Sequence, residues 1–326
     1  MTTRTTFKSR AVRCALPLLM AGVALPAAAA NNNHAYVANQ FDNTVSVIDT
    51  STNTVSATVA VGNGPVGIAV SPDGTDVYVA NQSDNSVSVI DAATHVVSST
   101  IAVGNAPQGI RVSPNGDYLY VANSADNTVS VIRTSTHAVV DTVAVGSAPS
   151  SIAVSPTGAR WYAANLGDGT VSVVTEGRQR KVIATVKVGD FPSGVATGPF
   201  GLQVYVANSG SSDLTVIDAA KNVAAATVTG LPSADAVASG VFGARVFVPS
   251  FNDGTVSVID TIRKTVVKTV TVGANPDAVA VSRNTGRVYV ANAGGNSVSV
   301  LDAISGKVIA TVDVGSFPAA VATQPE

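Results

Sequence analysis

Arg111, Asp235 and Asp277 are the residues of this sequence whose types best suit binding chemistry. A guanidinium donates paired hydrogen bonds to carboxylate or phosphate groups, and a carboxylate accepts them from cations and hydroxyls. An arginine that faces two carboxylates would bind a small polar ligand or contact a partner. The alternative is that the same three groups form a local salt bridge or line a solvated channel. Which of these roles applies depends on where the strands and loops place them.

Residues for metal or nucleophilic catalysis are scarce. The chain has three histidines, and two of them, His95 and His137, occupy the same position of a repeated unit, in a turn. We expect no metal site, because a transition-metal site needs several such side chains to converge. The sequence motifs of serine hydrolases, P-loop proteins and zinc proteases are absent. The sequence therefore predicts a protein that is not an enzyme and carries no cofactor.

The elements that position these residues follow from an internal repeat. The tetrapeptide Tyr-Val-Ala-Asn at 36–39 recurs six more times, in exact or similar form, at steps of 42 or 43 residues. The copies begin at Tyr78, Tyr120, Tyr162, Tyr205, Phe247 and Tyr289. Within the second copy, strands are predicted at 67–71, 77–81, 86–91 and 96–103, with turn residues between them. Four short strands in a unit of this length are typical of a β-propeller blade.

The sequence thus predicts an all-β, seven-bladed propeller of four-stranded antiparallel blades, with 31–326 as one domain. Val45, Val47 and Ile48 place apolar side chains on both faces of one strand, as expected when each blade packs between two others. The C-terminal strand at 319–323 is a first strand without a second, whereas the copy at 36–39 lacks a first strand. We expect these ends to pair and close the ring, which removes free sheet edges.

The predicted mouth of the central channel carries an uneven polar ring. The residue after the Pro of each copy, or its equivalent, reads Val66, Gln108, Ser150, Ser193, Asp235, Asp277 and Ala319. Arg111 stands near the same axis, where the other copies carry Ala. We expect the polar members of this ring, together with Arg111, to bind the ligand or partner.

Aromatic side chains surround this mouth. The loops that enter the first strands, and those between second and third strands, carry Phe41, Phe191, Phe251 and Phe317. Exposed aromatics gathered on one face suit contact with a protein or a glycan. Packing of the loops against one another is the alternative.

Two series of Asp residues recur at turns. Asp49, Asp91, Asp218, Asp260 and Asp302 end third strands, and Asp42, Asp84, Asp126, Asp168 and Asp253 lie in the turns before those strands. Asx turns would explain both series, with calcium binding as the alternative.

The repeat resembles the YVTN family of β-propeller repeats. The resemblance rests on Tyr-Val-Ala-Asn at 36–39, Asp-Asn-Thr-Val-Ser-Val-Ile-Asp at 42–49 and the Val-Gly to Pro-Asp-Gly segment at 61–74, and it covers 36–323. The chain is similar to archaeal surface-layer propellers and to a periplasmic propeller that binds single-stranded DNA. It also resembles lactonase-like and cytochrome- or quinone-linked propellers. Since these functions differ, the resemblance implies the architecture and not the activity.

The first 30 residues have the pattern of a cleaved signal peptide, with a retained anchor as the alternative. Basic residues between positions 4 and 13 precede an apolar segment at 15–26, and small residues place the cleavage after Ala30. The remaining chain has no cysteine, which suits the periplasm or cell surface of a bacterium. It holds 15 basic and 21 acidic residues, a formal net charge of −6 that argues against a general polyanion-binding surface.

These observations favour an exported, monomeric scaffold that binds a protein or an envelope polymer through the loops at the channel mouth. We expect no membrane span after signal cleavage. One alternative is a protein that binds single-stranded DNA through the basic residues Arg178, Arg180 and Lys181, with Lys187 nearby. Another is a lactonase-like hydrolase that uses Asp235 and Asp277.

Overall fold

The structure is a computed structural model that describes residues 1–3, 33–177 and 179–324. The predicted signal peptide at 1–30 lies outside the described residues, apart from its first three positions. The described chain from Asn33 onward forms a propeller, as predicted. Its only helical element is the short 3-10 helix η1 (Ala293–Gly295). No helix in the described ranges is long and apolar enough to cross a membrane.

Seven antiparallel sheets of four strands form the blades. Blade 1 combines β28 (Pro318–Thr323) with β1 (His34–Asn39), β2 (Thr44–Asp49) and β3 (Thr54–Ala60). Blade 2 comprises β4 (Pro65–Val70), β5 (Asp76–Asn81), β6 (Ser86–Asp91) and β7 (Val96–Ala102). Blade 3 comprises β8 (Pro107–Val112), β9 (Tyr118–Asn123), β10 (Thr128–Arg133) and β11 (Ala138–Ala144). Blade 4 comprises β12 (Pro149–Val154), β13 (Arg160–Asn165), β14 (Thr170–Thr175) and β15 (Lys181–Lys187).

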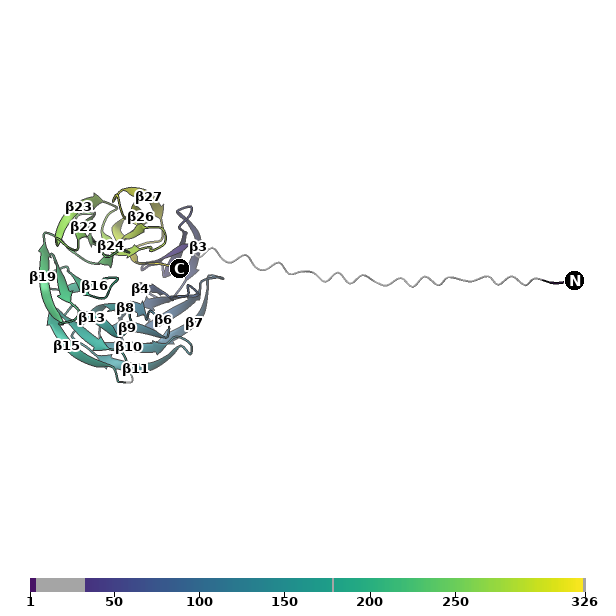
Figure 1. The fold of residues 1–326 in the computed structure, drawn as a ribbon, viewed down its shortest axis with the longest axis horizontal. Coiled ribbons are helices and arrows are strands. Elements are labelled where there is room, and N and C mark those ends of the chain that lie inside the picture. Colours follow the sequence, from purple (N-terminus) through teal and green to yellow (C-terminus); the bar gives the residue numbers. More distant parts are fainter. Residues whose placement is uncertain (4–32, 178, 325–326) are drawn as a thin grey trace. The chain divides into compact units, whose positions relative to one another are not determined.

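The other three blades follow in chain order. Blade 5 comprises β16 (Pro192–Thr197), β17 (Gln203–Asn208), β18 (Asp213–Asp218) and β19 (Val223–Thr229). Blade 6 comprises β20 (Ala238–Ser239), β21 (Arg245–Ser250), β22 (Thr255–Asp260) and β23 (Thr265–Thr271). Blade 7 comprises β24 (Pro276–Val281), β25 (Arg287–Asn292), β26 (Ser297–Asp302) and β27 (Val308–Asp313). Figure 1 shows the fourth strands at the circumference and β4, β8 and β24 near the centre.

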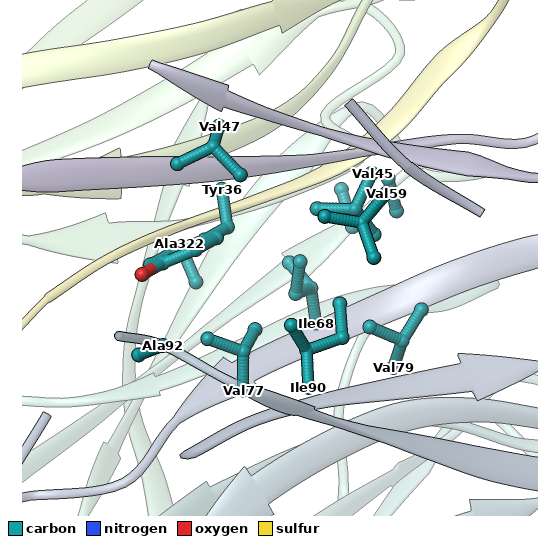
Figure 2. Close-up of a cluster of buried hydrophobic side chains, with 12 residues drawn as sticks. Tyr36, Val45, Val47, Val59, Ile68, Val77, Val79, Ile90, Ala92 and Ala322 are labelled. Atoms are coloured by element: carbon teal, nitrogen blue, oxygen red, sulfur yellow. The ribbon is translucent and has the colours of Figure 1, made fainter. Parts of the chain in front are cut away.

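Each blade buries both of its faces against its neighbours. Seven hydrophobic clusters fill the seven interfaces between adjacent blades. Figure 2 shows the cluster between blades 1 and 2, where Val45 and Val47 lie opposite Val77 and Val79. The second and third strands are therefore buried on both sides, as expected from their apolar sequences, whereas the fourth strands are mostly exposed.

A buried hydrogen-bond network explains the Asn that ends six of the seven second strands. Asn123 donates from Nδ2 to the hydroxyl of Thr128 at 3.0 Å and to that of Ser130 at 2.9 Å. Blades 1, 2, 4, 5 and 7 contain equivalent pairs of bonds from their own Asn. Gly104 in the preceding link packs against Asn123 so closely that an added Cβ would lie 2.6 Å from the Asn123 Cγ. These repeated polar residues are structural, because a buried amide needs such partners.

The composite blade closes the ring as predicted. Antiparallel pairing between β1 and β28 brings Val37 opposite Val321. The adjacent backbone adds a hydrogen bond of 2.9 Å from the Gln324 N–H to the His34 carbonyl oxygen. The two ends of the described propeller thus share one sheet.

Blade 6 is the exception to the repeat. Its first strand β20 spans two residues, and before it only an isolated bridge joins Ala234 to Ser250. In the sequence there, Thr229-Gly230 replaces the Val-Gly link, Ala234 stands at the position of the Pro of other copies, and Ser250 replaces the usual Asn. Residues 235–237, which correspond to first-strand positions of the other blades, consequently lie outside the ladder.

Candidate functional site

The first strands line the channel, and their direction defines two faces of the ring. All seven contribute to the wall of one axial cavity. Because strands alternate in direction within each blade, the links between blades and the loops between second and third strands lie on one side, here called the loop face. The turns between first and second strands and between third and fourth strands lie on the other, the turn face.

Two of the predicted polar-ring residues hold adjacent blades together. The Ser150 hydroxyl donates to the carbonyl oxygen of Pro192 at 2.9 Å, and the Ser193 hydroxyl donates to that of Ala234 at 3.1 Å. Both serines are half-buried, as is Gln108 at the same position of blade 3. The serine hydroxyls are therefore already used as donors within the ring.

Asp235 and Asp277 occupy the equivalent positions in blades 6 and 7. Burial raises the pKa of Asp277 to about 7, with the negative charge of Asp235 as the second cause. Burial alone raises the pKa of Asp235 to about 6. No ion pair with either carboxylate occurs among residues 33–177 and 179–324. The loop face thus presents two neighbouring carboxyl groups whose pKa values are raised towards neutral pH.

Arg111 does not face these carboxylates, contrary to the sequence-based expectation. It is the fifth residue of β8, three positions beyond Gln108, which displaces it roughly 10 Å along the channel at the usual rise of a strand. There it lines the cavity at the turn face together with Arg283, whereas Asp235 and Asp277 do not line that cavity. The structure therefore separates the predicted site into an acidic end and a basic end.

The four predicted aromatics do lie in loops of the loop face. The rings of Phe41 and Phe317 stack with centroids 4.6 Å apart and planes at 28°. Phe41 is nevertheless 66% exposed and Phe191 is 55% exposed, whereas Phe251 and Phe317 are half-buried. At this face, therefore, some aromatic rings pack between loops while others remain exposed to solvent.

Within the described part of the predicted basic cluster, Arg180 is paired with acidic residues. The Arg180 side chain is 8% exposed and pairs with Glu176 at 2.5 Å and Asp141 at 3.5 Å. It also stacks on the Tyr118 ring at 4.6 Å. Lys181 and Lys187 are exposed, and Arg178 lies outside the described residues. The positive charge of Arg180 is therefore balanced by the carboxylates of Glu176 and Asp141.

The histidine and aspartate series differ in part from expectation. His95 lies in the predicted turn but is half-buried, and its ring packs edge-on against that of His34 with centroids 5.5 Å apart. Within the described ranges, no three His, Cys, Asp or Glu side chains converge on a metal position.

The Asp residues that end third strands do form Asx turns, as Asp91 shows by accepting the Thr94 N–H at 2.8 Å. Four Asp residues of the other series, at positions 42, 84, 126 and 168, instead accept a backbone N–H from the link that enters their own blade. Asp126, for example, accepts the Asn105 N–H at 2.7 Å.

The turn face carries residues that the sequence reasoning missed. Arg283 stands where most copies have Pro, and Phe200 and Phe242 stand where others have Asp73, Asn115 or Thr157. Phe200 is 74% exposed and Phe242 is 84% exposed. Alignment of the turns between first and second strands would have revealed these departures.

Comparisons with known proteins agree on the architecture. A family profile described as a YNCE-like β-propeller matches residues 10–325. Hydrazine synthase of Kuenenia stuttgartiensis is 22% identical with a TM-score of 0.69, over 78% of this chain and 88% of that chain. A functionally unknown protein from Desulfotomaculum acetoxidans DSM 771 is 16% identical with a TM-score of 0.80, over 90% of this chain and 100% of that chain.

Two further matches are partial. The dihydro-heme d1 dehydrogenase NirN, in a complex with DHE, is 17% identical with a TM-score of 0.66, over 86% of this chain and 64% of that chain. The PE-PGRS family protein PE_PGRS18 of Mycobacterium tuberculosis is 65% identical over 37 residues, which is 11% of this chain and 8% of that protein. At these identities the solved structures show the fold alone.

Proposed function

Because this chain belongs to the YNCE-like β-propeller family, we propose that it is an exported, non-enzymatic propeller that binds a protein or an envelope polymer through its loop face. The exposed aromatics carry this proposal. Phe41 keeps 66% of its surface exposed although it stacks on Phe317, and Phe191 projects from the same face. Rigidly supported aromatic side chains of this kind are typical anchors of protein–protein interfaces.

The surroundings of these aromatics support recognition. The backbone N–H of Gln40 donates to the Phe317 carbonyl oxygen at 2.9 Å, so the Phe41 and Phe317 loops are tied together. Asp235 and Asp277 add two carboxyl groups near the centre of the same face. A partner that offers a cation or hydroxyl donors between apolar groups would match both features. Export and the bacterial periplasm or surface as location rest on the N-terminal sequence pattern and on the absence of cysteine after Cys14.

Site-specific photocrosslinking in the native envelope tests the proposal. A photoreactive amino acid at position 41 or 191 should yield a defined crosslinked partner, whereas the same group at 200 or 242 on the turn face should not. Phe41→Ala combined with Phe191→Ala should weaken binding of the purified partner at least about tenfold, since each buried aromatic anchor typically contributes more than about 1 kcal/mol. Equal crosslinking from both faces, or full affinity of the folded double variant, would contradict the proposal.

A hydrolase that uses Asp235 and Asp277 is the second candidate function. The observation that favours it is the raised pKa of both groups, to about 6 and about 7, which suits proton transfer near neutral pH. A panel of lactones would test it, with product formation compared between the wild type and the Asp235→Asn/Asp277→Asn variant. Turnover that the double substitution leaves unchanged would exclude this site as the catalytic centre. The remaining alternative, single-stranded DNA binding at the basic cluster, loses support because Arg180 is already paired.

A further inference from the structure

A second site lies at the turn-face end of the channel, away from the residues of the proposed interface. A cavity of about 680 Å³ is lined there by the ends of all seven first strands and, among the described residues, by the turns that follow six of them. Val, Ala, Pro and Gly make up most of its lining, and no Asp or Glu lines it among residues 33–177 and 179–324. Its size falls within the range of small-molecule sites, which are usually apolar cavities with a few polar groups.

Two arginines provide the charge of this cavity. Arg111 belongs to blade 3 and Arg283 to blade 7, which are three blades apart in a ring of seven, so the two side chains approach the axis from nearly opposite sides. Among residues 33–177 and 179–324, neither guanidinium forms a salt bridge. Both side chains are exposed to water inside the channel. They therefore retain free donors directed at a shared space.

The two arginines are also departures from the repeat. Arg111 replaces the Ala of the six other copies, and Arg283 replaces the Pro of most copies. The fold does not need either residue, since the other blades form the same strands without them. Enclosure lowers the pKa of Arg111, and repulsion from Arg283 lowers it further. Placing like charges in one enclosure is unfavourable unless an anion offsets them.

We infer that this cavity binds a small organic anion, whose carboxylate or phosphate group lies between Arg111 and Arg283 and whose apolar part packs on the Val, Ala and Pro walls. Bidentate donation by guanidinium groups suits both kinds of anion. Phe200 and Phe242 belong to two of the turns beside the opening and are exposed, although neither lines the cavity itself. The site is independent of the proposed partner interface on the loop face.

Isothermal titration calorimetry of the purified protein at low ionic strength tests this inference. The probes are phenyl phosphate, benzoate and the neutral benzyl alcohol, so that phosphate, carboxylate and uncharged ligands are compared. The variants are Arg111→Ala and Arg283→Pro, which restore the residues of the other blades and should therefore fold. Arg263→Ala removes an exposed arginine on the outer part of the ring and is the matched control.

We expect phenyl phosphate or benzoate to bind the wild type with 1:1 stoichiometry and benzyl alcohol not to bind. Each single variant should weaken binding about tenfold or more, because each removes charge-assisted hydrogen bonds. The Arg263→Ala variant should match the wild type. A preference between the two anions identifies the headgroup.

Two results would overturn the inference. One is the absence of anion binding by the wild type, or binding that the Arg111→Ala/Arg283→Pro double variant retains. The other is binding that appears only when the chain is shortened to end at Gln324. That result would mean that the carboxylates of Glu326, and not an external ligand, occupy the site.

Discussion

Tyr36 of β1 lies opposite Ala322 of β28 in antiparallel register, so the N-terminal and C-terminal segments of the propeller complete one blade together. Both residues also belong to the hydrophobic cluster between blades 1 and 2 (Figure 2). The last strand thus closes the ring in two ways, through backbone pairing with β1 and through side-chain packing on blade 2.

Truncation after Gly315 should open the ring. It removes β28, with the buried Ala320, Val321 and Ala322, and it exposes the unpaired edge of β1. Lost ladder bonds and apolar burial together cost on the order of 5 kcal/mol, which is comparable to the stability of a whole domain. Size-exclusion chromatography with light scattering should show oligomers formed through the free edge. Truncation after Gln324 keeps β28 and should leave a stable monomer; a monomer of unchanged melting temperature after the longer truncation would contradict this account.

Arg180→Ala should destabilise the propeller by about 3–5 kcal/mol. The substitution leaves Glu176, which also accepts the Tyr120 hydroxyl at 2.8 Å, without its cation in a partly buried network. Arg263→Ala removes a pair at the surface and should leave the free energy of unfolding nearly unchanged. Urea unfolding can be followed by fluorescence of Trp161, the single tryptophan, which is fully buried and packs on Tyr120. Equal losses of unfolding free energy in the two variants would show that the buried position of the Arg180–Glu176 pair does not increase its contribution to stability.

Gly104→Ala should destabilise the fold by about 1–3 kcal/mol, because the new Cβ would collide with the side chain of Asn123 and neither can shift without breaking the buried amide network. Gly198→Ala is the matched control. A Cβ at Gly198 would meet its nearest neighbour at 3.5 Å, and other blades carry Ser at this position. The difference between the urea unfolding midpoints of the two variants measures the effect of the contact between position 104 and Asn123. Similar midpoints would show that the backbone around position 104 can shift to accommodate the new Cβ.

The sequence predicts the architecture well because the repeat makes each strand visible seven times. The second to fourth strands of the repeat at Tyr78 agree with β5, β6 and β7 to within one residue at either end. The repeat does not predict the short first strand of blade 6. The sequence at 230–236 differs from that of the other copies, and most of the ladder pairing that the repeat implies is absent there.

The candidate site was less predictable. Position in the repeat identified Arg111, Asp235 and Asp277 as unusual, but it did not show at which end of a first strand each side chain lies. A shift of three positions along a first strand, as from Gln108 to Arg111, moves a side chain from one end of the channel to the other. The roles of Ser150 and Ser193 depend on carbonyl oxygens of the neighbouring blade, about 42 residues away, which no local pattern reveals.

Asp277→Asn should make the protein more stable than the wild type above neutral pH. The pKa of Asp277 is raised from 3.8 to about 7 in the folded state, so between these values the folded protein binds a proton that the unfolded chain has lost. Wild-type stability should therefore fall as pH rises from about 4 to about 7 and then level off.

The neutral amide that replaces the Asp277 carboxyl in this variant removes the contribution of Asp277 to the pH dependence and also relieves repulsion with Asp235. At pH 8 the variant should gain on the order of 2 kcal/mol, or a few degrees in melting temperature, whereas below pH 4 the two proteins should be nearly equal. Asp253→Asn makes the same charge change in an exposed loop and serves as the control. Parallel melting curves for the wild type and Asp277→Asn from pH 4 to pH 8 would show that the Asp277 carboxyl is solvated like an ordinary surface group, which would also remove the basis for proton transfer at the loop face.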